Sequence, residues 1–88
     1  EGGMRVPLLV YWPGKIKAQE NSEMAMNMDI FPTILKLLQL TPPKDRVIDG
    51  KELWSLWSGQ SQVSPHDFLY YFEQSGGVLS CVRNRQYK

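Results

Sequence analysis

The 88-residue chain has little from which to build a self-contained catalytic or metal site. It contains one cysteine, Cys81, and one histidine, His66. A single cysteine excludes an internal disulfide. One cysteine with one histidine also excludes a structural zinc site of four cysteines, or of two cysteines and two histidines. The lone histidine leaves little for acid–base chemistry.

Strong charge and long apolar runs are absent as well. Ten Lys and Arg residues stand against nine Asp and Glu residues, a formal net charge of +1. This balance gives no excess of positive charge of the kind that binds nucleic acid. The sequence also has no run of basic residues that would bind an anionic membrane surface. The longest apolar stretches, residues 6–12 and 34–40, fall far short of the ~20 residues of a membrane-spanning helix.

What is present is an ordinary globular composition, with 42% hydrophobic and 22% charged residues. A chain of this length is at most one small domain and buries only about 60–65% of its unfolded surface. Without disulfides or a metal it is marginally stable unless it packs on something else. There is no start methionine and no recognisable signal peptide, so we expect a piece of a longer chain.

The first half of the chain predicts a strand and a helix. Residues 5–12 form a continuous apolar run typical of a strand buried on both faces, with Pro7 near its start. Asp29 is expected to cap a helix with its carboxylate, and Pro32 suits the first turn. The apolar stripe of this helix should end before Thr41, which precedes a proline.

The second half predicts a short helix and a hairpin. Leu53, Leu56 and Trp57 share one face of a possible helix over residues 51–57. Two runs rich in aromatic and β-branched residues, 67–73 and 78–83, flank a connection containing Gly-Gly, which is a hairpin signal. Residues 86–88 look like the start of a third strand.

This order of elements predicts the α/β fold class, with an α+β appearance for the isolated piece. We interpret residues 1–59 as the end of an α/β core that contributes one βα unit and a short helix. Residues 60–66 would be a linker, and residues 67–88 the start of an antiparallel C-terminal subdomain.

The residues with catalytic potential mostly have simpler explanations. A Ser/His/Asp interpretation of His66 needs distant partners, so a loop histidine at the start of a strand is favoured. Cys81 is expected to be a small buried apolar residue, because no general base that would activate its thiol can be identified from the sequence. Asp29 is better explained as a helix cap, and Asp49 as part of an Asp-Gly turn with Gly50.

The segment from Glu1 to Arg5 is more informative. Gly2 and Gly3, flanked by an acid and a base, run into the predicted buried strand and could form the edge of an active site. The favoured alternative is that Arg5 ties two loops together through a carboxylate. The residues alone therefore indicate a piece of an α/β protein with no complete active site.

A series of short motifs resembles the C-terminal third of a sulfatase, in the arylsulfatase and steryl-sulfatase branch. The motifs, in order, are residues 1–7 (EGGMRVP), 12–14 (WPG), 28–33 (MDIFPT), 45–50 (DRVIDG), 64–71 (SPHDFLYY) and 83–88 (RNRQYK). The resemblance covers essentially the whole chain, and it rests on the order and spacing of these motifs together.

This resemblance implies membership of the alkaline-phosphatase-like superfamily and hydrolysis of aryl, steroid or sugar sulfate esters. Such enzymes use a formylglycine made from the Cys or Ser of a Cys/Ser-x-Pro-x-Arg motif. A divalent cation, usually calcium, neutralises the sulfate oxygens.

The chain departs from the family pattern at every reactive position. The segment from Cys81 to Arg85 lacks the proline of the formylglycine motif, and the family's metal-binding aspartates and Asp-Asn pair are missing. The catalytic lysine of the family usually lies a few residues before the element that begins at Glu1. The resemblance therefore assigns no catalytic and no metal-binding residue to this chain.

What the resemblance does assign is supporting structure. The residues expected near the active site are Glu1, Gly2, Gly3 and Arg5. Those expected to be architectural are Pro7, Asp29, Pro32, Thr33, Asp49 and Gly50.

The expected partner of the chain is the remainder of a sulfatase, and we expect the piece alone to be inactive and prone to self-association. One alternative is a truncated, non-catalytic interaction module that uses the aromatic strand from Phe68 to Phe72. Another is a small independent α+β binding domain. No nucleic-acid partner is expected. Sulfatases are secreted, lysosomal, membrane-associated or periplasmic, and the chain itself indicates no compartment.

Overall fold

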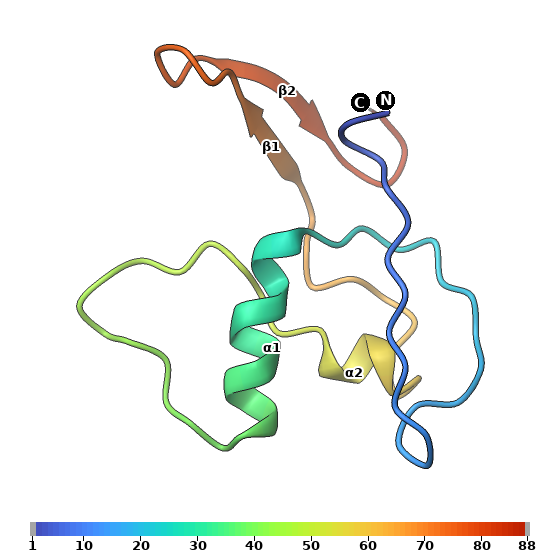
Figure 1. Ribbon diagram of the computed structural model, residues 1–88. Helices are drawn as coiled ribbons and strands as arrows, with labels where there is room; N and C mark the ends of the chain where they lie inside the picture. Colours follow the sequence, from blue (N-terminus) through green and yellow to red (C-terminus); the bar gives the residue numbers. More distant parts are fainter. Residues whose placement is uncertain (1, 88) are drawn as a thin grey trace.

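The computed structural model describes residues 2–87, which form two short helices and a β-hairpin. A 3₁₀ turn, η1 (Asn27–Asp29), leads into α1 (Ile30–Leu37), which is followed by α2 (Trp54–Trp57) and by the strands β1 (Leu69–Phe72) and β2 (Leu79–Arg83). The hairpin projects from the end of the molecule at which α1 begins, and α2 packs against α1 (Figure 1). The described residues are thus a small α+β piece, as predicted.

Helix α1 (Ile30–Leu37) ends before Thr41, as predicted, and the chain leaves it through a left-handed residue. Gln39 has φ 57°. Its N–H donates to Lys36 O at 3.1 Å, and the N–H of Leu40 donates to Leu35 O at 2.9 Å. These two bonds are the pairing of a Schellman motif, which satisfies carbonyls at the end of a helix. The helix therefore stops at Leu37, before the prolines that were expected to end it.

Leu53, directly before α2, and Leu56, within it, supply half of a small apolar core. The buried apolar side chains are Met24, Leu53, Leu56 and Leu69. They come from the loop before η1, from the start and body of α2, and from β1, so the core lies where these three parts meet. Trp54 packs its ring 5.8 Å from that of Trp12.

The predicted hairpin is confirmed. Strands β1 and β2 are antiparallel, with Tyr70 opposite Val82 and a bulge between Tyr71 and Phe72. The connecting residues Gly76 and Gly77 both have positive φ, 89° and 64°, which glycine adopts without steric cost. Burial of Cys81, however, is not found, because this side chain is only half-buried on β2.

The strand predicted over residues 5–12 is not formed in this structure. Among residues 2–87, the two strands pair only with each other. An extended segment becomes a strand only when neighbouring backbone groups bond its N–H and C=O groups, so the expected βα unit lacks its strand here. The apolar side chains of this segment face solvent, with Leu9 86% exposed and Tyr11 82% exposed.

The predicted third strand is not seen either, at residues 86 and 87. The side-chain oxygen of Asn84 accepts the N–H groups of Gln86 and Tyr87, and the N–H of Asn84 donates to Tyr87 O at 2.8 Å. These bonds fold the chain into a turn, because an Asn side chain offers the backbone a local partner. The last predicted residue of that strand, Lys88, lies outside the described residues.

Candidate functional site

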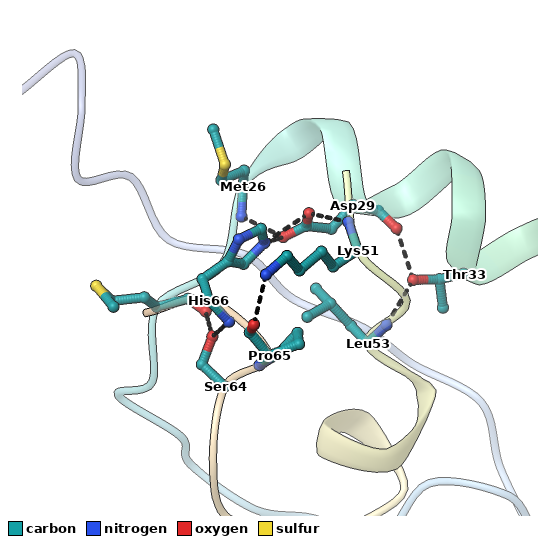
Figure 2. A network of polar contacts seen from close by, with 9 residues as sticks. Met26, Asp29, Thr33, Lys51, Leu53, Ser64, Pro65 and His66 are labelled. Carbon is teal, nitrogen blue, oxygen red and sulfur yellow. Dashed lines mark hydrogen bonds and ion pairs between the residues drawn. The ribbon is translucent and has the colours of Figure 1, made fainter. Parts of the chain in front are cut away.

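Asp29 is the centre of the largest polar cluster in the described chain. Its carboxylate is completely buried. One oxygen, Oδ2, accepts the N–H of Met26 at 2.7 Å, and the other, Oδ1, accepts the N–H of Lys51 at 2.8 Å (Figure 2). The carboxylate therefore joins the turn before α1 to a segment more than twenty residues later.

This arrangement corrects the predicted role of Asp29. The residue does stand immediately before α1, but its side chain makes no capping bond to the first turn of that helix. The carboxylate instead closes the preceding turn, η1, and binds distant groups. A buried carboxylate is stabilised by several N–H donors, and here they come from Met26, Lys51 and His66 instead of the first turn of α1.

His66 provides a further donor to the same carboxylate. Its Nε2 lies 2.8 Å from Oδ1 and 2.9 Å from Oδ2 of Asp29, and both side chains are buried (Figure 2). An ionised carboxylate only accepts hydrogen bonds, so Nε2 carries the proton in this pair. The histidine is a loop residue just before β1, as expected, and it fixes the start of the hairpin against the start of α1.

The cluster also contains a serine, but not in the arrangement of a nucleophile. The hydroxyl of Ser64 donates to Met24 O at 2.5 Å and accepts the backbone N–H of His66 at 3.0 Å. Nucleophilic activation would need this hydroxyl bonded to the imidazole ring. The Ser, His and Asp side chains thus meet in space without forming a catalytic triad.

Thr33 extends the cluster toward α2. Its Oγ1 donates to Asp29 O at 2.6 Å and accepts the N–H of Leu53 at 2.9 Å (Figure 2). The side chain of Lys51 reaches across to Pro65, donating from Nζ to the carbonyl oxygen at 2.9 Å. Among the described residues, every fully buried side-chain nitrogen and oxygen has a hydrogen-bond partner. Hydrogen-bonded networks of buried polar groups rigidify the structure around them.

Gly50 is required by close packing rather than by a turn. A Cβ at this position would lie 2.1 Å from Met28 O, closer than any side chain tolerates. The expected Asp-Gly turn is not formed, and Asp49 lies on the surface. The absence of a side chain at Gly50 lets this segment pass directly over the backbone at the start of α1, where the next residue bonds Asp29.

The residues predicted at the edge of an active site lie apart from this network. Gly2 and Gly3 are exposed, and a Cβ added to either would meet nothing within 4 Å; Arg5 and Pro7 are exposed too. Within residues 2–87, Arg5 makes no ion pair, so the expected tie between two loops is not made by the described residues. Glu1 lies outside them.

The remaining ionic contacts are of two kinds. Glu23 accepts the N–H of Ser64 at 2.9 Å and pairs with Arg85 at 3.2 Å, which fastens the chain after β2 to the loop before η1. Asp45 and Arg46 form a fully exposed pair at 2.9 Å. The guanidinium lowers the pKa of the Asp45 carboxyl, and the carboxylate raises the pKa of Arg46.

Two classes of site are absent from the described part of the chain. Residues 2–87 contain no group of three or more His, Cys, Asp and Glu side chains placed to hold a metal ion. Over the same residues, no helix is long and apolar enough to cross a membrane.

The sequence identifies most members of the cluster but not their association. Asp29 and Thr33 were expected to be architectural, whereas the pairing of Asp29 with His66 was not foreseen. The two residues lie 37 positions apart, and no periodic pattern connects them. The one local signal is that Asp29 directly precedes an apolar run, whereas His66 stands between Pro65 and Asp67.

Comparisons with known proteins agree on one family. The family model described as "N-sulphoglucosamine sulphohydrolase, C-terminal" matches residues 1–88. Steryl-sulfatase of Homo sapiens is 49% identical over 84 residues, which cover 94% of this chain and 14% of the relative. N-acetylgalactosamine-6-sulfatase of Canis lupus familiaris is 43% identical over 89 residues, which cover 100% of this chain and 16% of the relative.

A third relative, arylsulfatase G of Mus musculus, is 37% identical over 93 residues, which cover 100% of this chain and 18% of the relative. The chain therefore spans less than a fifth of the length of each of these three relatives. The match of the family model over the whole chain, together with these identities, shows that the chain belongs to the sulfatase family and corresponds to a C-terminal piece of such a protein.

Proposed function

We propose that the protein containing this chain, called the parent protein below, hydrolyses sulfate esters of the aryl, steroid or sugar class. The observation that carries the proposal is the match to a sulfatase family model over all 88 residues. The named relatives are a steryl-sulfatase, an N-acetylgalactosamine-6-sulfatase and an arylsulfatase, so they differ in substrate but share the hydrolysis of sulfate esters.

We further propose that the parent protein uses a formylglycine and a divalent cation, with calcium the first candidate. The described residues do not fit either group. They offer no cluster of metal ligands, and the half-buried Cys81 is followed by Val82 and Arg83 rather than by the motif that is converted. In our proposal both groups therefore belong to the parent protein outside residues 1–88.

The contribution of this chain, in our proposal, is structural. The cluster around Asp29 joins the start of α1, the segment that leads to α2 and the loop before the hairpin. These bonds set the relative positions of elements that the parent protein must pack against its remaining chain. Because both the nucleophile and the cation lie outside residues 1–88 in our proposal, we expect the isolated chain to turn over no sulfate ester.

Arg5 is the residue of this chain that we propose lies nearest the active site, with Gly2 and Gly3. Its exposed guanidinium has no ion-pair partner among the described residues, so it can brace a loop of the parent protein. We propose that it acts as a positioning residue and does not touch sulfate.

The test is release of sulfate from an aryl sulfate, a steroid sulfate and a sugar sulfate by the purified parent protein. We expect turnover of at least one ester, with loss of turnover after chelation of divalent cations and recovery on adding calcium. Turnover by the isolated 88-residue chain would contradict the structural role. Failure of the parent protein with all three esters would favour the non-catalytic interaction module.

A further inference from the structure

A groove of about 680 Å³ opens beside the Asp29 cluster. Its apolar lining comes from Met26, just before η1, from Met28 within η1, and from Phe68, Tyr70 and Phe72 at β1. The polar residues of the lining are Asp49, Asp67, His66 and Lys51.

The hairpin turns its aromatic face into this groove. Side chains alternate between the two faces of a strand, and in β1 Leu69 is buried in the core. Phe68, Tyr70 and Phe72 lie on the opposite face and are about half exposed. The rings of Phe68 and Tyr70 are 6.4 Å apart, so the exposed aromatic surface is continuous.

Such a surface indicates that something packs on it. Contiguous exposed apolar patches mark interaction sites, and a two-stranded hairpin is marginally stable unless another element covers one of its faces. Here the core face of β1 is covered only around Leu69, because Tyr71 is half-buried. The aromatic face, together with Met28, has no covering element among residues 2–87.

The share of the relatives that this chain covers indicates the occupant. The chain corresponds to 14–18% of the relatives' length, so most of a family member's polypeptide lies elsewhere. A second copy is a poorer candidate. A two-fold contact brings the same surface of both copies together, and two facing hollows would leave a void instead of filling it.

We propose that the groove is a docking surface for an apolar segment of the parent polypeptide that lies outside residues 1–88. The segment places its apolar side chains against Tyr70, Phe72 and Met28 and a basic side chain toward Asp49 and Asp67 on the rim. This inference rests on the parent protein being a full-length member of the family, as in the proposed function. It adds the place and the chemistry of one internal contact.

Two methionines make the test possible without substitution. Met24 is 7% exposed, in the core, and Met28 is 45% exposed, in the groove. Peroxide oxidises a methionine in proportion to its access to solvent. The native parent protein and the same protein unfolded in urea are oxidised in parallel, and each methionine is followed by peptide mass spectrometry.

We expect Met28 in the native parent protein to oxidise about tenfold or more slowly than in the unfolded protein, as Met24 does. A rate for Met28 close to the unfolded rate, with Met24 still protected, would overturn the proposal. Protection that disappears on dilution to a monomer would overturn it in favour of a second copy. Sulfate-ester turnover, measured on the same sample, reports on the proposed function alone. The docking proposal and the proposed function can therefore fail separately.

Discussion

At the residue scale, the buried carboxylate of Asp29 joins three segments of the chain. Asp29 accepts two backbone N–H groups and the imidazole N–H of His66, and all of them come from different parts of the chain. A carboxylate is suited to this position because it has only acceptors to offer. An uncharged amide of the same shape would present its own donors to at least one of these groups.

We therefore predict that Asp29→Asn lowers the free energy of unfolding of the parent protein by about 2–3 kcal/mol. Urea denaturation measures the change. The matched control is Asp45→Asn, because Asp45 is an exposed partner of Arg46 and surface ion pairs contribute little. An equal loss of unfolding free energy in both variants would show that the buried cluster contributes no more to stability than an exposed ion pair.

A second residue-scale prediction concerns Gly50. Gly50→Ala places a methyl group against Met28 O, and the backbone must shift to accept it, at a cost of about 1–3 kcal/mol. Gly3→Ala is the control for stability, because open space surrounds that position. Thermal unfolding of both variants distinguishes them, and an unchanged melting temperature for Gly50→Ala would contradict the close approach.

The Asp45–Arg46 pair gives a prediction for pH. Because the pKa of Asp45 is lowered in the folded chain, the pair stabilises the fold at pH values above the unfolded pKa, about 3.9. That contribution is lost as the pH falls through the folded pKa. Replacing Arg46 by Gln should raise the pKa of Asp45, as followed by NMR titration. About 1 M salt should do the same by screening, and a pKa unaffected by either change would refute the pairing.

At the scale of elements, Thr33 couples the two helices. Its hydroxyl bonds the backbone of Asp29 at the start of α1 and takes the N–H of Leu53 at the start of α2. Valine has the same shape without the hydroxyl, so the buried N–H of Leu53 would lose its partner. The relative position of α1 and α2 thus depends on one side chain.

We predict that Thr33→Val destabilises the parent protein by about 1–3 kcal/mol, the cost of a buried polar group left without a partner. Thr41→Val, at an exposed position in the loop after α1, is the control and should change little. Hydrogen exchange gives a more local measurement, because the N–H of Leu53 should exchange faster in Thr33→Val. Unchanged protection of that amide would argue against the bond.

The elements that could be predicted from the sequence are those specified by local patterns. The apolar stripe of α1, the short α2 and the hairpin around its glycines all appear near their predicted positions. The strand over residues 5–12 does not form, because a strand depends on partners that are not among residues 2–87. The role of Asp29 was predicted incorrectly for a related reason. Two of its hydrogen-bond donors, Lys51 and His66, come from distant segments of the chain.

At the scale of the whole molecule, the chain exposes more apolar surface than a self-contained domain would. Residues 5–12, the aromatic face of β1 and the outer face of α1, with Phe31, Ile34 and Leu38, all carry exposed large apolar side chains. The chain after α1 also swings out as a wide loop (Figure 1). These surfaces agree with a piece whose stability depends on the rest of the parent protein.

The same surfaces predict how the isolated chain behaves. Exposed apolar faces and unpaired strand edges promote association, so light scattering of the purified 88-residue chain should show oligomers or aggregates at micromolar concentration. In the parent protein we expect these faces to be covered, so it should not show this association through residues 1–88. A cooperative, monomeric isolated chain would contradict the account of its exposed surfaces.

We propose that this chain supports its parent sulfatase structurally and that the Asp29 cluster contributes no catalytic group. The most direct measurement is the turnover number per folded molecule of the parent protein carrying His66→Gln, with the folded fraction determined on the same sample. We expect a lower melting temperature and a turnover number within about twofold of that of the unchanged parent protein. A turnover number reduced by about a hundredfold or more at an unchanged melting temperature would show that the cluster acts in catalysis.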